Sequence, residues 1–247
     1  MKQNEAVILT LEKLGGVATL GQLNQETLKI KECAWKTKTP FASIRRIVQL
    51  DKNIYKIKAG LYGLEKFRAE IESRGIIAET EKNKNSQEVI ESNHSYFQGL
   101  LLIVGNLKGL NTFVPNQDKN KKFIDKNLGE IRTLSILPEY SFPSIVKRSS
   151  TIDVIWFNER NMPHSFFEVE HSTDIQNSLL KFNDLQDFHS RMVIVADVVR
   201  KQEYLTKIKY SSFKDLSAKN RVSFLDYEAL NYQYENIVKQ KPSDFIL

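Results

Sequence analysis

The sequence predicts an α/β domain, a mixed sheet flanked by helices, that follows a small N-terminal winged helix-turn-helix domain. The apolar run 192–199 is typical of a strand covered on both faces, and two more strand-like segments lie at 151–157 and 165–170. In residues 1–64, apolar residues at helical spacing give way to an alternating pattern. A length of 247 residues suits two modest domains.

The front domain is expected to consist of helices followed by a β-hairpin. Thr39-Pro40 is typical of a helix start, because proline is tolerated at the first helical position. The alternation around Ala59-Gly60 favours a hairpin. The expected elements are a helix over 4–14, a short helix over 20–28, a helix from Pro40, a hairpin over 54–64 and one more helix over 65–78.

The polar, turn-prone stretch 80–90 is interpreted as a linker. This division assigns residues 1–79 to the front domain and 91–247 to the second domain. The elements expected in the second domain are a helix over 96–104, strands over 151–157 and 165–170, a helix over 174–189, a strand over 192–199, a helix over 201–210 and a strand over 221–227.

The composition excludes several kinds of site. No apolar run approaches the length of a membrane helix and the N-terminus lacks the pattern of a signal peptide, so we expect a cytoplasmic protein with no membrane segment. The single Cys33 excludes an internal disulfide and a cysteine-cluster zinc site. The four histidines have no metal-binding spacing, so we expect oxygen atoms to hold any metal.

The net charge of +6 is concentrated at the front of the chain. Residues 1–84 hold 16 basic and 10 acidic side chains, whereas residues 85–247 hold 20 of each. Such a patch is typical of a surface that binds phosphates, and double-stranded DNA is the expected partner. A solvated lysine face is the alternative interpretation.

Three acidic residues of the second strand pair form the candidate catalytic site. Residues two apart in a strand share a face, so Glu168 and Glu170 point the same way. If the turn takes six residues, Phe157 pairs with His164, and Asp153 lies opposite Glu168 with Cβ atoms about 5 Å apart. Such like charges are destabilising unless a divalent cation compensates for them. We therefore predict that Asp153 and Glu168 bind Mg²⁺, which can polarise a phosphodiester and generate a hydroxide.

The alternative is a hairpin whose acids only keep a solvent-facing side soluble, because the D-x14-E-x-E spacing alone is weak. Apolar strands and a capped helix directly after Glu170 favour the catalytic interpretation. In that helix start, Thr173 and Gln176 fit a capping box. His171 could contact the scissile phosphate or be structural. Lys181 could reach the site as a cation, but a solvated helix lysine is the favoured interpretation.

The order helix, acidic strand hairpin, helix, buried strand over roughly residues 88–230 resembles the PD-(D/E)XK nuclease superfamily. The resemblance implies a restriction-endonuclease-like fold in which the hairpin acids bind magnesium. The last motif residue is usually lysine there, whereas Glu170 stands in its place here, as in some restriction endonucleases with an E-x-E ending. By that analogy Glu170 orients or deprotonates the attacking water, or is a second metal ligand.

The stretches 35–49 and 54–64 are similar to the HARE-type helix-turn-helix, through Trp35, Thr39-Pro40 and the closing GLYGL. This module is found joined to restriction endonucleases and is thought to read DNA. A helix that presents two adjacent arginines could enter the major groove, but their side chains point about 100° apart, so only one is expected to read a base edge. The residues expected to contact DNA are Lys36, Lys38, Thr39, Ser43, Arg45, Arg46, Lys56 and Lys58.

The resulting hypothesis is a Mg²⁺-dependent, type II-like restriction endonuclease that hydrolyses duplex DNA at a short recognition sequence. Asp153, Glu168 and Glu170 would be the catalytic residues. A homodimer is expected, because palindromic cutting needs two sites and each chain carries one. Two alternatives stay open: a DNA-binding regulator with an inactive nuclease-like domain, and a structure-specific repair nuclease that cuts branched DNA.

Overall fold

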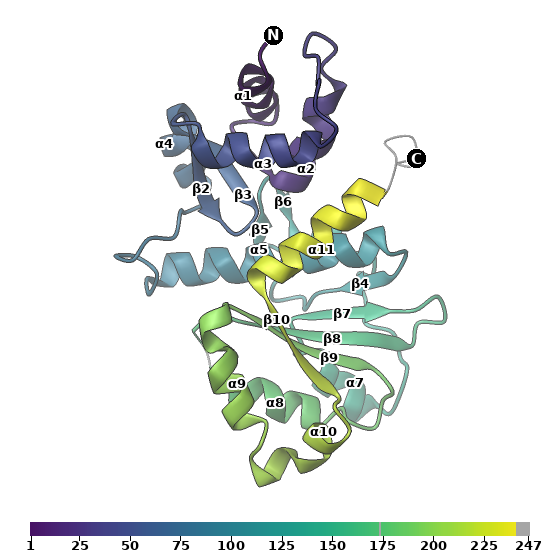
Figure 1. Cartoon of the computed structure of the whole chain (residues 1–247). Helices are drawn as coiled ribbons and strands as arrows, with labels where there is room; N and C mark the ends of the chain where they lie inside the picture. Colours follow the sequence, from purple (N-terminus) through teal and green to yellow (C-terminus); the bar gives the residue numbers. More distant parts are fainter. Residues whose placement is uncertain (173, 241–247) are drawn as a thin grey trace. The chain divides into compact units, whose positions relative to one another are not determined.

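The computed structural model of the chain describes residues 1–172 and 174–240 and divides into two compact units (Figure 1). Unit 1 is Met1–Ser92 together with residues 231–240 of the C-terminal segment, and unit 2 is Asn93–Leu230. This division differs from the expected one. The stretch expected to be a linker lies in unit 1, and the C-terminal segment belongs with the front of the chain rather than with the second domain.

Unit 1 has the predicted helices followed by a hairpin. Its elements are α1 (Gln3–Lys13), β1 (Val17–Thr19), α2 (Leu20–Glu26), η1 (Thr27–Lys29), α3 (Pro40–Leu50), β2 (Ile54–Lys58), β3 (Leu61–Leu64), η2 (Glu65–Phe67) and α4 (Arg68–Ser73). The strands form an antiparallel sheet in the order β1-β3-β2. Pro40 is the first residue of α3, as predicted. The helix expected to reach residue 78 ends at Ser73, close to Gly75 with its φ of 81°.

The C-terminal part of α11 (Tyr227–Gln240) packs within unit 1. Tyr234 is almost fully buried, and its hydroxyl lies 3.3 Å from Oγ1 of Thr19, the residue that caps α2. A Cβ on Gly21 would come within 2.5 Å of the Tyr234 ring, so glycine allows this close approach. Sequence reasoning assigned no helix to this segment.

Unit 2 is built on a five-stranded mixed sheet with the order β10-β9-β8-β7-β4. Strands β8, β9 and β10 are parallel, and β7 and β4 continue the sheet antiparallel, which confirms the predicted mixed sheet flanked by helices. From α5 (Gln87–Leu107), the elements are β4 (Asn111–Phe113), β5 (Lys122–Phe123), β6 (Lys126–Asn127), α6 (Leu128–Ile131), α7 (Pro143–Ser149), β7 (Val154–Phe157), β8 (Pro163–Glu170), α8 (Ile175–Asn183), β9 (Arg191–Ala196), η3 (Val198–Arg200), α9 (Lys201–Lys207), η4 (Ser211–Phe213), α10 (Lys214–Ala218), β10 (Val222–Asp226) and α11.

One face of this sheet packs against α8, α9 and α10 through buried apolar side chains (Figure 1). Strand β9 is central and buried, as its apolar run predicts, but it ends at Ala196 rather than at 199. The Asp197 side chain accepts a hydrogen bond from Val199 N and starts η3, which leaves Val198 59% and Val199 80% exposed. The chain therefore turns away from the sheet beside the end of β8.

The predicted pairing of β7 with β8 is confirmed over most of its length. Val154 pairs with Phe167 and Ile155 with Phe166, which is the expected register. At the turn end, Phe157 pairs with Pro163 instead of His164, because the register shifts at an irregularity after Trp156.

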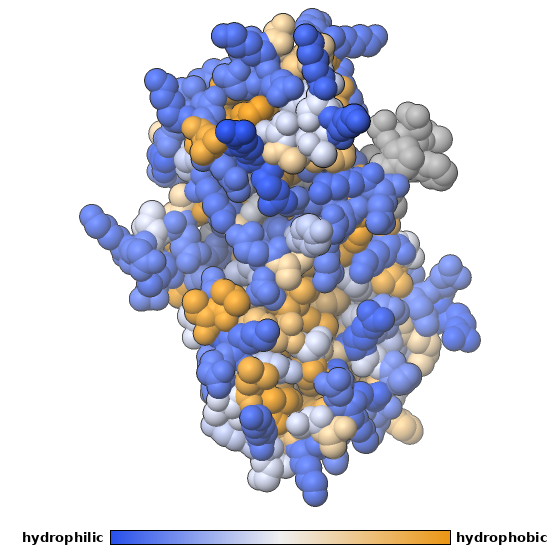
Figure 2. Space-filling model, viewed as in Figure 1, coloured by the Kyte–Doolittle hydropathy of each residue, from blue (hydrophilic) through white to orange (hydrophobic). Residues whose placement is uncertain are grey.

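The surface face in Figure 2 is mostly hydrophilic, with small apolar patches. Scattered apolar side chains are normal on protein surfaces, so these patches do not by themselves mark an interface. Across residues 1–172 and 174–240, no helix combines the length and the apolarity that a membrane span requires.

Candidate active site

Glu168 and Glu170 lie on the face of β8 that packs against α8, and both are buried, with 2% and 4% exposure. The Ser178 hydroxyl of α8 lies 3.0 Å from Glu168 Oε2 and also contacts Glu170 Oε1. The two carboxylates thus meet at one hydroxyl, as their shared strand face predicts. Sequence reasoning missed Ser178.

Asp153 directly precedes β7, and its backbone lies beside the Glu168 carboxylate. Its backbone N–H donates to Glu168 Oε1 at 3.3 Å. Its carboxylate Oδ2 accepts a 2.8 Å hydrogen bond from Val169 N and lies 3.1 Å from His94 Nε2 on α5. The structure therefore brings together all three predicted acids, with the Asp153 carboxylate oriented by a backbone N–H and a histidine.

The charges of this cluster are balanced by protein cations. Burial raises the pKa of Glu168 well above its usual value and the Asp153 carboxylate adds to the rise, although the Lys181 ammonium opposes it. Burial would also raise the pKa of Asp153, but His94 and the Val169 N–H more than offset it and lower that pKa. Burial disfavours the charged form of His94, yet the Asp153 carboxylate raises its pKa. The site therefore avoids three full, uncompensated negative charges.

Lys181 is part of the site, so its interpretation as a solvated helix lysine is wrong. Its Nζ lies 2.7 Å from Glu168 Oε2 and 3.0 Å from the Thr151 carbonyl oxygen, and its side chain is 24% exposed. The reason is helical geometry: residues three apart share a helix face, and Ser178 already points at the acids. That spacing was readable in the sequence once α8 was placed against β8.

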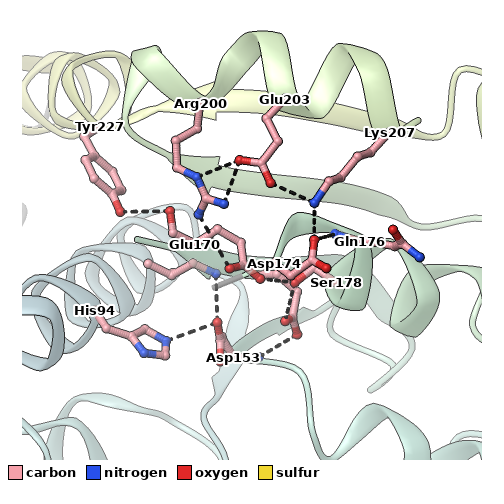
Figure 3. Close-up of polar contacts among 12 residues, drawn as sticks. His94, Asp153, Glu170, Asp174, Gln176, Ser178, Arg200, Glu203, Lys207 and Tyr227 are labelled. Carbon is pink, nitrogen blue, oxygen red and sulfur yellow. Dashed lines mark hydrogen bonds and ion pairs between the residues drawn. The ribbon is translucent and has the colours of Figure 1, made fainter. Parts of the chain in front are cut away.

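A second layer of charges surrounds Glu170 (Figure 3). Arg200 Nη1 lies 3.9 Å from Glu170 Oε2, and Arg200 Nη2 pairs with Glu203 at 2.8 Å. Lys207 pairs with Glu203 at 2.9 Å and also with Asp174. The turn after β9 and helix α9 thus supply cations to the acidic end of β8.

The start of α8 is capped by Asp174, whose side chain accepts from Gln176 N at 2.9 Å. The expected capping role of Thr173 lies outside the described residues. His171 is partly buried and its ring stacks on Tyr227 with centroids 6.5 Å apart, an environment that accounts for it structurally.

Helix α5 contributes His94 and Gln98, which sequence reasoning missed because it searched the histidines only for metal spacing. The Gln98 side chain Nε2 donates to the Asp153 carbonyl oxygen at 3.3 Å and to Asp118 Oδ2 at 2.9 Å. The signal in the sequence was the four-residue separation of His94 and Gln98, which places them on one helix face.

Carboxylate oxygens, the kind of ligand that magnesium prefers, lie at this site. In the described part of the chain no group of three or more His, Cys, Asp or Glu side chains is arranged as a ready metal site. Magnesium, however, is usually held by one or two carboxylates, with water and phosphate oxygens as the other ligands. Asp153 and Glu168 are two neighbouring carboxylates, and the Lys181 ammonium lies 2.7 Å from Glu168 Oε2, where it offsets negative charge.

Comparison with known proteins places this site in a family. Residues 75–244 match the family of the type II restriction enzyme NmeDI C-terminal domain. The chain belongs to that family. The type II restriction enzyme NmeDI of Neisseria meningitidis serogroup C is 24% identical over 162 residues, which cover 62% of this chain and 45% of that protein. The match thus spans less than half the length of the relative. No solved structure matches the chain.

The family match contains all the acids of the site, together with His94, Ser178 and Lys181. It begins after α4 and runs through α11, so the helices and hairpin of residues 1–74 lie outside it. The predicted DNA-contacting residues all lie in that unmatched part.

The structure separates the two arginines of α3. Arg45 forms an ion pair with Glu235 of α11, and Glu235 is nearly fully buried. Arg46 is exposed and lines a groove of about 410 Å³ between α3 and α11, together with Phe41 and Gln49. The Arg45 side chain is 41% exposed and lines the same groove, but its guanidinium is paired with Glu235.

The other predicted contact residues differ in exposure. Lys36, Lys38, Thr39 and Lys56 are exposed, and Ser43 is partly buried. The prediction that Lys58 contacts DNA is wrong, because this side chain is buried. Lys58 is 6% exposed, and its Nζ donates to Ser92 Oγ at 2.8 Å. The register of β2 shifts between Lys56 and Lys58, which turns Lys58 inward.

Proposed function

We propose that the protein is a Mg²⁺-dependent, type II-like restriction endonuclease that hydrolyses phosphodiester bonds of double-stranded DNA at a short recognition sequence. The observation that carries the proposal is the meeting of Asp153, Glu168 and Glu170 with Lys181, inside the region that matches a restriction enzyme family. The order of elements resembles the PD-(D/E)XK superfamily, in which the acids of the hairpin bind magnesium.

Each group has a role in the proposed reaction. Asp153 and Glu168 would hold the magnesium ion, which supplies Lewis-acid activation of the phosphodiester and of a water molecule. His94 and the Val169 N–H keep the Asp153 carboxylate in one orientation. The E-x-E ending lacks the usual lysine, and Lys181 brings an ammonium group to Glu168 from helix α8, so it would contact the scissile phosphate or the attacking water. Glu170 would orient or deprotonate that water, unless it is a second metal ligand.

The front unit would bind the DNA as a HARE-type winged helix-turn-helix. Lys36, Lys38 and Lys56 are exposed and suit phosphate contacts, which position the protein but do not specify sequence. Arg46 is the side chain of α3 best placed to read a base edge. Cutting of both strands at a palindromic sequence would involve a homodimer.

The test is cleavage of unmethylated plasmid or phage DNA with and without Mg²⁺. We expect discrete fragments from the wild type, no cutting by Asp153→Asn, and normal cutting by Glu159→Gln, an exposed acid in the turn of the same hairpin. Cutting of branched DNA alone would indicate a repair nuclease. A mobility shift without any Mg²⁺-dependent cutting would indicate a DNA-binding regulator and would refute the proposal.

A further inference from the structure

A group of lysines lies in unit 2, outside the basic region that the charge distribution predicts. Residues 119–127, here called the basic ribbon, contain four lysines and one acidic residue, although the segment 85–247 as a whole is neutral. They include the paired strands β5 and β6. The lysines are Lys119, Lys121, Lys122 and Lys126. Lys121 is partly buried, with 37% of its side chain exposed, and the other three lysines are exposed.

The basic ribbon is anchored to helix α5. Phe123 is 6% exposed and stacks on Tyr96, with ring centroids 5.3 Å apart and planes at 17°. A Cβ on Gly99 would come within 2.4 Å of the Phe123 ring, so glycine is needed for this contact. Ile124 in the turn is also buried. The lysines therefore project from a fixed backbone rather than from a loose loop.

A chain of polar contacts connects the basic ribbon to the candidate active site. Lys121 Nζ lies 2.6 Å from Asp118 Oδ1, and Asp118 Oδ2 accepts the 2.9 Å hydrogen bond from Gln98. The same Gln98 nitrogen donates to the Asp153 carbonyl oxygen. The ribbon thus lies within a few side chains of the metal-binding acids.

We propose that the basic ribbon binds the phosphate backbone of duplex DNA beside the scissile bond. The inference rests on the proposed function, because a duplex that reaches Asp153 brings its neighbouring phosphates to the adjacent surface. Lysine ammonium groups attract such phosphates and release their counterions, which supplies affinity without sequence preference. Unit 2 would therefore bind DNA directly, in addition to the contacts that unit 1 makes.

The test measures how salt weakens DNA binding. Lys119, Lys122 and Lys126 are changed to alanine in an Asp153→Asn background that does not cut, and Lys121 is kept because it pairs with the buried Asp118. A control with equal charge loss changes the exposed lysines Lys209, Lys214 and Lys219. Binding of a short labelled duplex of random sequence is followed by fluorescence anisotropy over a series of salt concentrations.

Each phosphate contact contributes about 0.9 to the slope of log K against log salt. The ribbon variant should lower this slope by about 2–3 and weaken binding at low salt by at least about tenfold, and the control should match its Asp153→Asn parent. Equal slopes for ribbon variant and parent, or equal losses in ribbon variant and control, overturn this inference and leave the proposed function standing. Absence of any duplex binding by the parent overturns both.

Discussion

Replacement of Lys181 by methionine should separate cutting from DNA binding. The change keeps most of the aliphatic stem but removes the ammonium group 2.7 Å from Glu168 Oε2 and 3.0 Å from the Thr151 carbonyl oxygen. Loss of one preorganised charged donor at a reacting centre costs about 2.7–4 kcal/mol in the transition state, which corresponds to a fall of roughly 10²–10³-fold in the cleavage rate. The free energy of unfolding should fall by only about 1–3 kcal/mol, because one buried polar partner is lost.

The assay is single-turnover cleavage of plasmid DNA with saturating enzyme and Mg²⁺, together with urea unfolding and a DNA-binding measurement. Lys214→Met serves as the matched control, since it removes an exposed helix lysine from the same unit. Lys181→Arg keeps the charge and should recover part of the rate. A Lys181→Met protein that cuts at the wild-type rate would refute the placement of this side chain in the chemistry, and equal losses of cutting and binding would show that it only supports the fold.

Two further predictions concern unit 1. Burial lowers the pKa of Lys58 to about 7 from its ordinary 10.5. Between these pH values the Lys58 side chain holds a proton in the unfolded chain but not in the folded chain. The free energy of unfolding should therefore rise by up to ~1.4 kcal/mol per pH unit as the pH rises. Lys58→Met should remove this slope from urea unfolding measured between pH 7 and about 10.5. The control Lys56→Met, which replaces an exposed lysine, should keep it. A slope that survives Lys58→Met would contradict the buried position of Lys58. Arg46→Ala should weaken binding to the recognition sequence by about 1–3 kcal/mol and relax specificity. Arg45→Ala removes a partner of the buried Glu235 and should mainly lower the free energy of unfolding. Equal losses of specificity for the two variants in competition binding would contradict the assignment of base reading to Arg46.

The strand pairing of the candidate site could be predicted because its cause is local. Alternating side chains and a short turn leave few registers for β7 and β8, and the register that pairs Val154 with Phe167 follows from counting residues. Asp153, just before β7, then lies beside Glu168. The hairpin β2–β3 was predictable for the same reason, with Gly60 at a positive φ of 71° in its turn.

Features that depend on packing were not predictable in this way. The inward turn of Lys58 comes from a register shift that the alternation of β2 does not reveal. Lys181 reaches Glu168 only because α8 lies across β8, and a single helix pattern does not say which strand it will cover. The charge of the basic ribbon was missed, because net charge was counted over residues 85–247, where acidic and basic side chains cancel.

The position of α11 limits how this protein can be divided or recombined. Its second half supplies unit 1 with the buried Tyr234, and with Asn231, which lies so close to Gly60 that a Cβ there would come within 2.2 Å of its Oδ1. A chimaera that transplants only residues 1–92 would lack the part of α11 that packs within unit 1. Transfer of unit 1 to another chain therefore requires grafting two segments, one from the start of the chain and one from residue 231 onward.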